Sequence, residues 1–256
     1  MKTSGNTILI TGGGSGIGEA LAHRFHDAGN TVIIGGRRQE ALEAAAVGRP
    51  NMHAMTLDVE SAEGVVDFAK RVLAAHPALN VLINNAGIMR MEALDAARDL
   101  SDAEATIETN LVGPIRLINA FVDHLTAQDD SAIVNVTSGL AFVPLVDFAT
   151  YCATKAAIHS YTVAMREALK GKVEVIELAP PAVQTGLTPG QENRPGYQPL
   201  DEFADEVMAL FAQQPTPPEI LVERVGFLRN AEREGRFEAT VTQLNDFARQ
   251  ARANQG

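Results

Sequence analysis

Short runs of aliphatic and β-branched residues alternate with longer stretches of helical periodicity along this sequence. The runs that predict strands are Thr7–Thr11, Thr31–Gly35, Met52–Leu57, Val81–Asn84, Ala132–Thr137, Val173–Leu178 and Glu219–Val225. The stretches that predict helices are Gly16–Ala28, Arg38–Ala46, Ala62–Ala75, Asp102–Thr126, Tyr151–Lys170, Leu200–Gln213 and Ala231–Ala251. Repeated β–α units favour a parallel sheet with helices on both faces. We therefore predict an α/β fold built on a doubly wound parallel sheet of seven strands.

Composition favours one domain over residues 1–256, since 256 residues suit a single α/β unit and 46% of them are hydrophobic. The net charge of -11 and the scattered Lys and Arg residues argue against nucleic acid and acidic membranes as partners. The single cysteine, Cys152, excludes an internal disulfide and suits a reducing compartment. The first residues lack the apolar core of a signal peptide, and no apolar run reaches the roughly 18 residues of a membrane span. We expect a cytoplasmic protein.

The segment "ILITGGGSGIGEALA" begins as a strand, passes through glycines and ends as a helix. Backbone N–H groups at such a helix start can approach a pyrophosphate closely, because no side chains intervene. A tight turn is the alternative explanation for the glycines. The spacing is Thr11-Gly12-x-x-x-Gly16-x-Gly18, which differs from G-x-G-x-x-G, and no Gly-Lys-Ser/Thr follows as in a Walker loop. We interpret the segment as a nucleotide site.

"TGGGSGIG" resembles the cofactor loop of the classical short-chain dehydrogenases/reductases, and other motifs of that family follow in order. They are "NNAG" at 84–87, Asn110 in "TNLVGP", Ser138 in "NVTSG", Tyr151 and Lys155 after 13 and 17 further residues, and "APPAVQT". These motifs span residues 11–185, about two-thirds of the chain. The resemblance implies a Rossmann-type domain that binds NAD(P).

The resemblance also implies a catalytic set of Ser138, Tyr151, Lys155 and Asn110. Tyr151 would be the general acid–base, Ser138 would hydrogen-bond the substrate oxygen, and Asn110 would hold a water-mediated proton path. Positions i and i+4 share one helix face, so Lys155 can lie beneath Tyr151 and lower the pKa of its phenol from about 10. Alternatively, Ser138 caps a loop and Asn110 satisfies a neighbouring backbone group.

The end of the second predicted strand, "VIIGGRR", carries no acidic residue to hold the ribose hydroxyls of NAD. Arg37 and Arg38 could instead clamp a 2′-phosphate, and a basic residue here accompanies NADP in the family. We therefore predict NADP(H). The alternative is a solvated helix start. Asp58 and Val59, after the third strand, match the pair that contacts the adenine ring.

The remaining cofactor contacts follow from the resemblance. They are Gly12, Gly14, Ser15, Gly16, Ile17, Gly18, Asn84, Ala86, Gly87, Tyr151, Lys155, Pro180, Val183 and Thr185. Pro181 stands where the family usually has glycine, and proline fixes φ and removes a donor, so the path of this loop is open. No metal is expected: His23 and His26 are too few to form a metal site.

The last seventy residues match the family poorly. Residues 186–200 form a predicted substrate loop rich in proline and glycine, and 201–256 form a divergent C-terminal part. Phe237, Val241, Leu244 and Phe247 make a helical stripe that packs on the domain or contacts another subunit. Together with "LAPPAVQT" and "LTPG", this end of the chain is similar to a branch of short-chain oxidoreductases named after D-alanine transfer to teichoic acid. A homodimer or homotetramer is expected.

Two functions from different classes fit these motifs. One is an NADP(H)-dependent carbonyl reductase or alcohol dehydrogenase that acts on a small-molecule carbonyl or alcohol. The other is a non-catalytic NADP(H)-sensing regulator on the same fold. The intact Ser138, Tyr151 and Lys155 favour the enzyme, because a sensor would not need them. An epimerase or dehydratase is disfavoured, since its relatives carry a larger C-terminal substrate domain.

Overall fold

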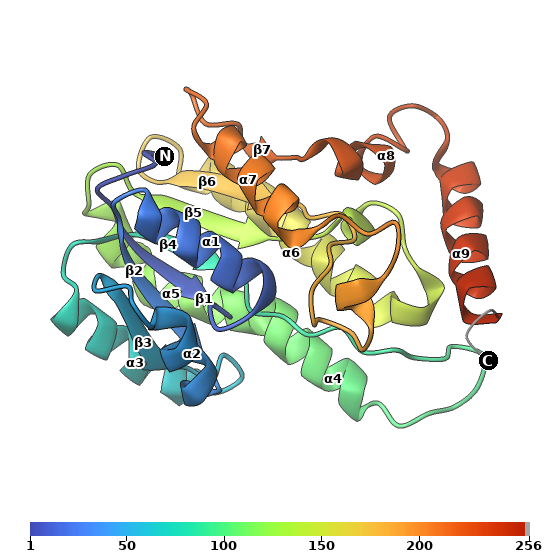
Figure 1. The fold of residues 1–256 in the computed structure, drawn as a ribbon, viewed down its shortest axis with the longest axis horizontal. Helices are drawn as coiled ribbons and strands as arrows, with labels where there is room; N and C mark the ends of the chain where they lie inside the picture. The colour runs from blue at the N-terminus through green and yellow to red at the C-terminus, as the bar shows by residue number, and fades with distance from the viewer. Residues whose placement is uncertain (254–256) are drawn as a thin grey trace.

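The computed structural model describes residues 1–253 and contains the predicted parallel sheet of seven strands (Figure 1). The strands are β1 (Thr7–Thr11), β2 (Thr31–Gly36), β3 (Met52–Thr56), β4 (Leu79–Asn84), β5 (Ala132–Val136), β6 (Glu174–Leu178) and β7 (Glu219–Ile220). Their order in the sheet is β3-β2-β1-β4-β5-β6-β7, and every neighbouring pair is parallel. The direction of winding reverses between β1 and β4, which creates the crevice where ligands bind in such sheets.

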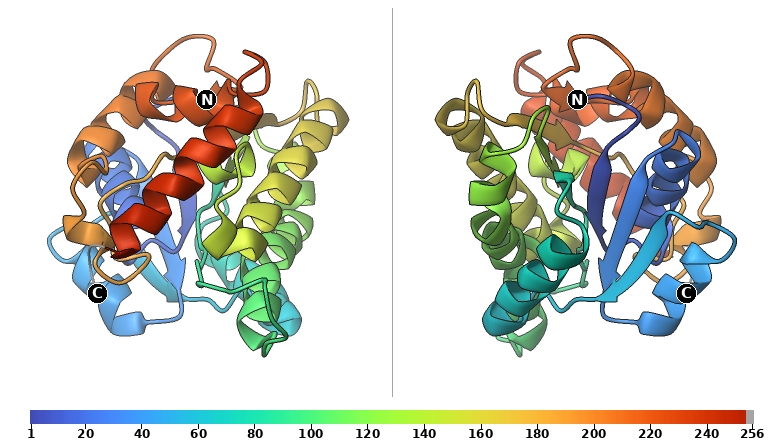
Figure 2. Two further views of the ribbon diagram at one scale, coloured as in Figure 1. Left: turned by 90° about the vertical axis from the view of Figure 1, so that its right-hand side faces the viewer. Right: turned by 90° about the vertical axis from the view of Figure 1, so that its left-hand side faces the viewer.

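Helices cover both faces of this sheet (Figure 2). They are α1 (Gly16–Asp27), α2 (Gln39–Ala46), α3 (Ala62–Ala75), α4 (Ser101–Ile107), α5 (Gly113–Thr126), α6 (Ala149–Ala168), α7 (Leu200–Phe211), α8 (Gly226–Arg229) and α9 (Phe237–Ala253). Helices α1, α2 and α7 pack on one face, and α3, α5 and α6 pack on the other. Among residues 1–253, no helix has the length and apolar character that crossing a membrane requires.

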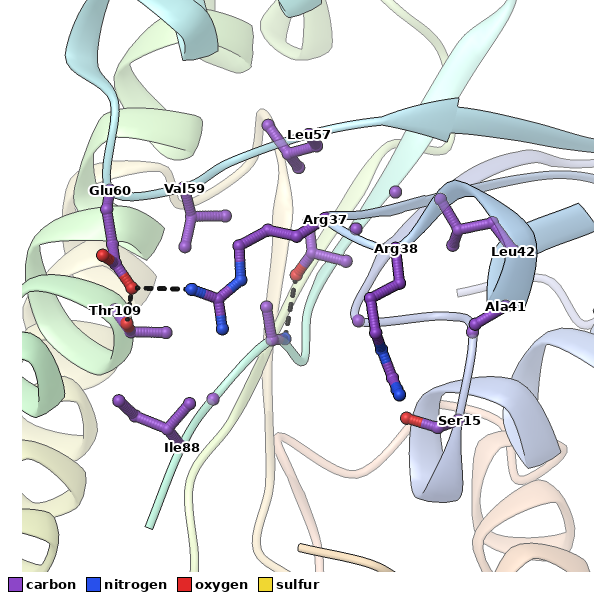
Figure 3. Close-up of a pocket in the computed structure, with 17 residues that line it drawn as sticks. Ser15, Arg37, Arg38, Ala41, Leu42, Leu57, Val59, Glu60, Ile88 and Thr109 are labelled. Atoms are coloured by element: carbon purple, nitrogen blue, oxygen red, sulfur yellow. Dashed lines mark hydrogen bonds and ion pairs between the residues drawn. The ribbon is translucent and has the colours of Figure 1, made fainter. Parts of the chain in front are cut away.

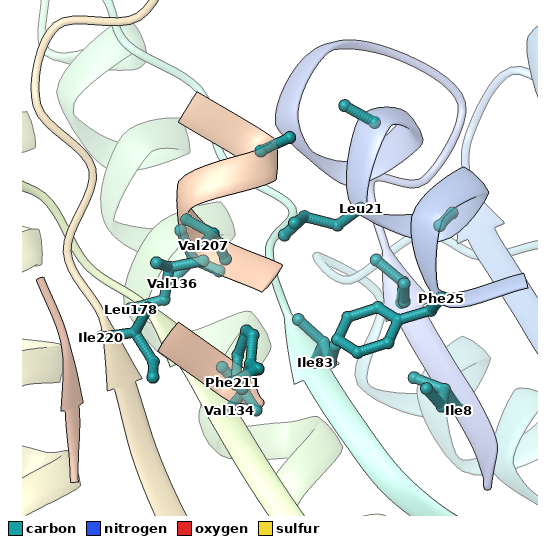
Figure 4. Packing of buried hydrophobic residues seen from close by; sticks show 14 of the residues in the cluster. Ile8, Leu21, Phe25, Ile83, Val134, Val136, Leu178, Val207, Phe211 and Ile220 are labelled. Atoms are coloured by element: carbon teal, nitrogen blue, oxygen red, sulfur yellow. The ribbon is translucent and has the colours of Figure 1, made fainter. Parts of the chain in front are cut away.

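Strands inside the sheet contribute to both cores, because successive side chains point to opposite faces. Ile8 and Ile10 belong to the cluster under α1 and α7, whereas Leu9 belongs to the cluster under α3 and α5. In the first cluster, Phe25 of α1 meets Phe211 of α7 with 5.6 Å between ring centroids (Figure 4). Full burial of such a side chain stabilises the fold by about 1.5–3 kcal/mol. Burial on both faces explains why the strand sequences are almost continuously apolar.

The predicted helix over Asp102–Thr126 is interrupted. A π-helical segment, Glu108–Val112, separates α4 from α5, and Asn110 lies within it. Pro114 follows in the first turn of α5, where its missing N–H costs little. Helical periodicity continues through the segment, so the sequence pattern alone did not reveal the interruption. Single π turns inside helices are frequent at functional sites.

The C-terminal elements differ most from the predictions. Strand β7 covers only Glu219–Ile220, because the chain turns into a 3₁₀ segment at Glu223–Val225 that directs Val222 and Val225 into the core. The predicted helix over Ala231–Ala251 instead begins at Phe237, after a turn in which Gly235 has a φ of +69°. Glycine adopts this left-handed conformation readily, so it ends the preceding turn.

A buried polar residue of helix α9 bonds to the segment that precedes α6. The buried Asn245 accepts a hydrogen bond from Val146 N at 2.8 Å and donates to the Pro144 carbonyl oxygen at 3.1 Å. Within the predicted apolar stripe of this helix, Leu244 is half-buried while Phe247 is 61% exposed. The stripe therefore divides between the domain and the surface.

Candidate active site

The loops that follow β1 and β4 lie side by side at the carboxyl edge of the sheet and hold each other in place. Thr11 Oγ1 accepts hydrogen bonds from the backbone N–H groups of Asn85 and Ala86, both at 3.0 Å. Asn85 Nδ2 donates to the Thr11 carbonyl oxygen at 2.8 Å. A Cβ atom at position 18 would lie 2.3 Å from the Gly12 carbonyl oxygen, so Gly18 is needed where the loop enters α1. The glycine loop thus has a rigid, backbone-lined shape.

A cavity of about 200 Å³ opens in front of these loops (Figure 3). Of the predicted cofactor residues, its wall contains Gly12, Gly14, Ser15, Arg37, Arg38, Val59, Ala86 and Gly87. The wall also contains residues that were not among the predicted cofactor contacts: Thr11, Gly35, Gly36, Ala41, Leu42, Leu57, Glu60, Ile88 and Thr109. Backbone-exposing glycines, guanidinium groups and aliphatic side chains together suit a ligand with phosphates and a flat apolar ring.

The other predicted cofactor residues lie outside this wall: Gly16, Ile17, Gly18, Asp58, Asn84, Tyr151, Lys155, Pro180, Val183 and Thr185. Asn84 is buried, and its Nδ2 donates to Asn135 Oδ1 at 2.9 Å. Its own Oδ1 is buried and has no hydrogen-bond partner within residues 1–253. The Asn84 side chain therefore ties β4 to β5, and its neighbour Asn85 bonds to the glycine loop.

The two arginines after β2 point in different directions. Arg37 Nη1 lies 3.5 Å from Glu60 Oε1, across the cavity, and the same oxygen accepts a hydrogen bond from Thr109 Oγ1 at 2.6 Å. The Arg38 side chain extends toward Ser15 of the glycine loop (Figure 3). Both arginines are exposed, so their charges act through solvent. One cationic group thus lies near the phosphate loop, and a second is paired with a carboxylate.

The three residues of the predicted catalytic centre come from neighbouring elements and are all buried. Ser138 follows β5, and Tyr151 and Lys155 lie one turn apart on α6. Lys155 Nζ donates to the Val136 carbonyl oxygen at 2.8 Å and lies 5.6 Å from the centroid of the Tyr151 ring. The Ser138 hydroxyl accepts a hydrogen bond from Leu140 N at 3.1 Å. The structure therefore brings the predicted trio together.

Burial dominates the electrostatics of this centre. It raises the pKa of Tyr151 to about 12, against the opposing effect of the hydrogen bond with Ser138. It lowers the pKa of Lys155 to about 8. The expectation of a lowered phenol pKa is therefore wrong, because desolvation of the phenolate is the largest influence on this group and raises its pKa. At neutral pH Tyr151 carries its proton.

Asn110 acts on the backbone beside the cavity. Its Oδ1 accepts from Ile88 N and its Nδ2 donates to Ile88 O, each at 2.8 Å. The same Nδ2 lies 3.4 Å from Thr154 Oγ1 on α6. The π segment thus places a side-chain amide between the "NNAG" loop and the helix that carries Tyr151.

The chain that follows β6 closes the other side of the site. Residues 182–184 run beside Gln198, with hydrogen bonds from Gln198 N to Ala182 O at 2.9 Å and from Gln184 N to Gln198 O at 2.8 Å. The buried Gln191 donates from Nε2 to Val183 O at 2.8 Å and to Thr185 Oγ1 at 3.2 Å. The loop that begins with Pro181 therefore has a defined path despite its departure from the family pattern.

The C-terminal part packs directly behind Ser138. A Cβ atom at position 139 would lie 2.9 Å from Leu228 Cδ1 and 3.1 Å from Val225 Cγ2, so Gly139 allows this contact. Gly139 N also donates to Pro180 O at 2.8 Å. Residues from two distant stretches of the chain, Pro180 and 225–228, therefore fix the turn that follows Ser138.

Comparison with known proteins agrees with this geometry. The short chain dehydrogenase family profile matches residues 6–195. The chain belongs to the short-chain dehydrogenase family. It is 40% identical over 252 residues to an uncharacterized oxidoreductase, DltE, of Bacillus subtilis (strain 168), with 96% of this chain and 100% of that protein covered. It is 29% identical over 192 residues to 11-beta-hydroxysteroid dehydrogenase 1A of Arabidopsis thaliana, covering 73% of this chain and 55% of that one.

Solved short-chain dehydrogenases share the fold. One from Burkholderia cenocepacia J2315, in complex with NADP, has a TM-score of 0.83 at 28% identity and covers 95% of this chain and 99% of its own. A 3-ketoacyl-(acyl-carrier-protein) reductase from Brucella melitensis, complexed with NADH, has a TM-score of 0.77 at 25% identity, with 85% of this chain and 96% of its own covered. Membership of the short-chain dehydrogenase family makes this protein an oxidoreductase of Rossmann-like fold.

Several residues that shape the site were not predicted as site residues. Thr11 and Asn85 stand inside the motifs "TGGGSGIG" and "NNAG" and are visible as polar residues at strand ends. Glu60 and Thr109 come from segments 49 residues apart, so no local pattern could have paired them. Gln191 lies in the irregular loop, where sequence periodicity gives no information.

Proposed function

We propose that this short-chain dehydrogenase is an NADP(H)-dependent carbonyl reductase or alcohol dehydrogenase in which Tyr151 is the general acid–base. The observation that carries the proposal is the convergence of Ser138, Tyr151 and Lys155, all buried, at the carboxyl edge of the sheet that also holds the glycine-lined cavity. A small-molecule carbonyl or alcohol is the proposed substrate class.

The residues of the cavity suit a dinucleotide phosphate. The glycine loop exposes backbone N–H groups at the start of α1, where the helix dipole favours an anion. Val59 and Leu57 offer an apolar surface for an adenine ring, and Val183 and Thr185 would meet the nicotinamide amide. When bound, the cofactor supplies or accepts the hydride.

Arg37 and Arg38 support NADP(H) over NAD(H). No carboxylate follows β2 to hold both ribose hydroxyls and repel a 2′-phosphate. Glu60 pairs with Arg37, whereas Arg38 extends toward Ser15 of the glycine loop. The Burkholderia short-chain dehydrogenase was solved with NADP and the Brucella reductase with NADH, so both cofactors occur among the structural relatives.

The catalytic chemistry follows from the protonation of Tyr151. Because burial keeps the phenol protonated at neutral pH, Tyr151 can give its proton to a carbonyl oxygen held by Ser138. Lys155, held by Val136 O, places a positive charge below the ring and stabilises the phenolate that results. Asn110 fixes Ile88 next to the reacting region and would support a water-mediated proton path.

A non-catalytic NADP(H) sensor is the second candidate, since the cofactor cavity by itself would serve it equally well. The desolvated Lys155 argues against a sensor, because burying an ammonium costs free energy and cofactor binding alone does not require it.

We further propose that the chain is one domain with residues 186–200 as the substrate loop. We also propose a homo-oligomeric state and a cytoplasmic location, and the single Cys152 supports the latter.

The test is turnover of NADPH and NADH by the purified protein with a panel of ketones, aldehydes and alcohols, together with calorimetric binding of both cofactors. We expect carbonyl-dependent NADPH oxidation that is faster than NADH oxidation. Tight NADPH binding without turnover of any panel member would favour the sensor. Absence of cofactor binding would refute both.

A further inference from the structure

One carboxylate near the catalytic helix is buried although its neighbours are exposed. Residues 90–100 lead from the "NNAG" loop over the surface, and most of them are open to solvent. The side chain of Glu92 is the exception, with 7% of it exposed. Its backbone N–H donates to Asp147 O at 2.9 Å. The loop is therefore fastened at Glu92 to the segment that precedes α6.

The Glu92 carboxylate caps the helix that carries Tyr151. One oxygen accepts a hydrogen bond from Thr150 N, and the other accepts from Thr150 Oγ1 at 2.9 Å. Arg98, from the same loop, forms an ion pair with the second oxygen. Phe148 occupies the N-cap position of α6 and supplies no side-chain cap. A residue 58 positions earlier in the chain thus satisfies a donor that the helix itself leaves free.

A carboxylate suits this place electrostatically. Burial on its own would raise the pKa of Glu92, but the hydrogen bonds from Thr150 and the ion pair with Arg98 together lower it below its ordinary value. Glu92 therefore stays ionised, and an anion at a helix N-terminus interacts favourably with the aligned peptide dipoles. Thr150 immediately precedes Tyr151, so any movement of this first turn moves the phenol.

We propose that Glu92 is a positioning residue for the reaction: it fixes the first turn of α6 against the loop 88–100 so that Tyr151 faces Ser138. The inference rests on the proposed function, because it assigns to Glu92 the placement of the proton donor. Cofactor binding does not depend on it, since Glu92 contributes nothing to the wall of the cofactor cavity.

The experiment compares Glu92→Ala and Glu92→Gln with the wild-type protein. We expect Glu92→Ala to lower kcat by about tenfold to a hundredfold, since a displacement of about 1 Å at a reacting group can have such an effect. Glu92→Gln keeps an acceptor for Thr150 N and should recover part of the loss. The affinity for NADPH should stay within about twofold. The primary isotope effect with deuterated NADPH should rise, because a misplaced Tyr151 makes the chemical step limiting.

Glu219→Gln is the matched control. Glu219 is also a partly buried carboxylate paired with an arginine, Arg229, but it lies on β7 and caps no helix. We expect Glu219→Gln to lower thermal stability without changing kcat or the isotope effect. Hydrogen exchange of residues 149–155 should accelerate in Glu92→Ala and stay unchanged in Glu219→Gln.

An active wild-type protein whose Glu92→Ala variant keeps kcat and its isotope effect within twofold would overturn the inference and leave the proposed function standing. A wild-type protein that turns over no carbonyl or alcohol with either cofactor would overturn the proposed function. The proposed role of Glu92 in catalysis would then be overturned as well. The two failures are thus distinguished by the wild-type protein alone.

Discussion

The two ends of the site differ in how they hold charge. At one end Arg37 and Arg38 are exposed, and Arg37 Nη1 lies 3.5 Å from Glu60 Oε1. At the other end Tyr151 and Lys155 are buried, and burial shifts both pKa values. The exposed charges act through solvent and should govern affinity. The buried charges should govern rate, stability and pH dependence.

The largest effect is expected at the buried end. Tyr151→Phe removes the proton donor while keeping the ring, so kcat should fall by about 10²–10⁴. NADPH affinity, measured by calorimetry, should change little because the substitution keeps the aromatic ring and removes only one hydroxyl group. A Tyr151→Phe variant with full turnover would refute the acid–base role. A large loss of NADPH affinity would instead mean that the buried end of the site contributes to cofactor binding.

The second prediction concerns stability and Lys155. The Lys155 ammonium loses its proton at a lower pH in the folded protein than in the unfolded chain. The free energy of unfolding therefore rises with pH between about 8 and the ordinary lysine pKa of 10.5. Below that window the buried ammonium costs on the order of 3 kcal/mol. Lys155→Met should therefore raise the free energy of unfolding at neutral pH, by less than this amount because the bond to Val136 O is lost.

This gain should shrink as the pH approaches 10. Urea unfolding of both proteins at about pH 7 and about pH 9.5 measures the difference in their free energies of unfolding. Both pH values lie below the range in which the raised pKa of Tyr151 lowers the stability of the folded protein. A Lys155→Met variant that is less stable than wild type at neutral pH would show that the lysine is better compensated than its burial implies.

The third prediction concerns the exposed end. Arg37→Asp replaces a cation with an anion near the proposed 2′-phosphate, and it also places a carboxylate beside Glu60. The ratio of kcat/KM for NADPH over NADH should fall by about tenfold or more, since a lost charge-assisted bond is worth roughly 1.5–3 kcal/mol. The value of kcat with saturating NADPH should stay close to wild type. An unchanged ratio would refute the assigned role of Arg37.

Salt should produce the smallest effect. Raising the ionic strength from about 0.01 M to about 1 M shortens the screening length from about 30 Å to about 3 Å. NADPH affinity should therefore weaken several-fold, while kcat at saturation stays nearly constant because the buried pair is poorly screened. Stopped-flow binding and steady-state rates at matched salt concentrations measure the difference. An equal fall of NADPH affinity and kcat would contradict the distinction between exposed charges at one end of the site and buried charges at the other.

Local patterns predicted the sheet, and they also predicted that Ser138, Tyr151 and Lys155 lie close together. Strand β1, the glycine loop and α1 are neighbours in sequence, and Tyr151 and Lys155 need only helical spacing to share a face. The family motifs then placed Ser138 at the end of β5. All of these depend on short-range geometry that a strand or helix imposes by itself.

The sequence could not reveal what depends on distant contacts. The interruption of the helix at Asn110 is stabilised by bonds to Ile88, and the cap of α6 comes from Glu92. The pKa of Tyr151 depends on how completely several elements exclude water from it. The short β7 and late start of α9 reflect packing of Val222, Val225 and Asn245 against parts of the chain that no local window contains.

The contact of Gly139 with Val225 and Leu228 has a consequence for protein engineering. The C-terminal part of this chain diverges from the family, whereas the family motifs upstream of it are present. This contrast suggests that the C-terminal part could be exchanged without affecting the site. Its side chains nevertheless form the back of the turn that orients the Ser138 hydroxyl. A chimera that exchanges residues 201–253 for those of another short-chain dehydrogenase would therefore inherit a different serine geometry, unless residue 139 and its two neighbours were grafted together.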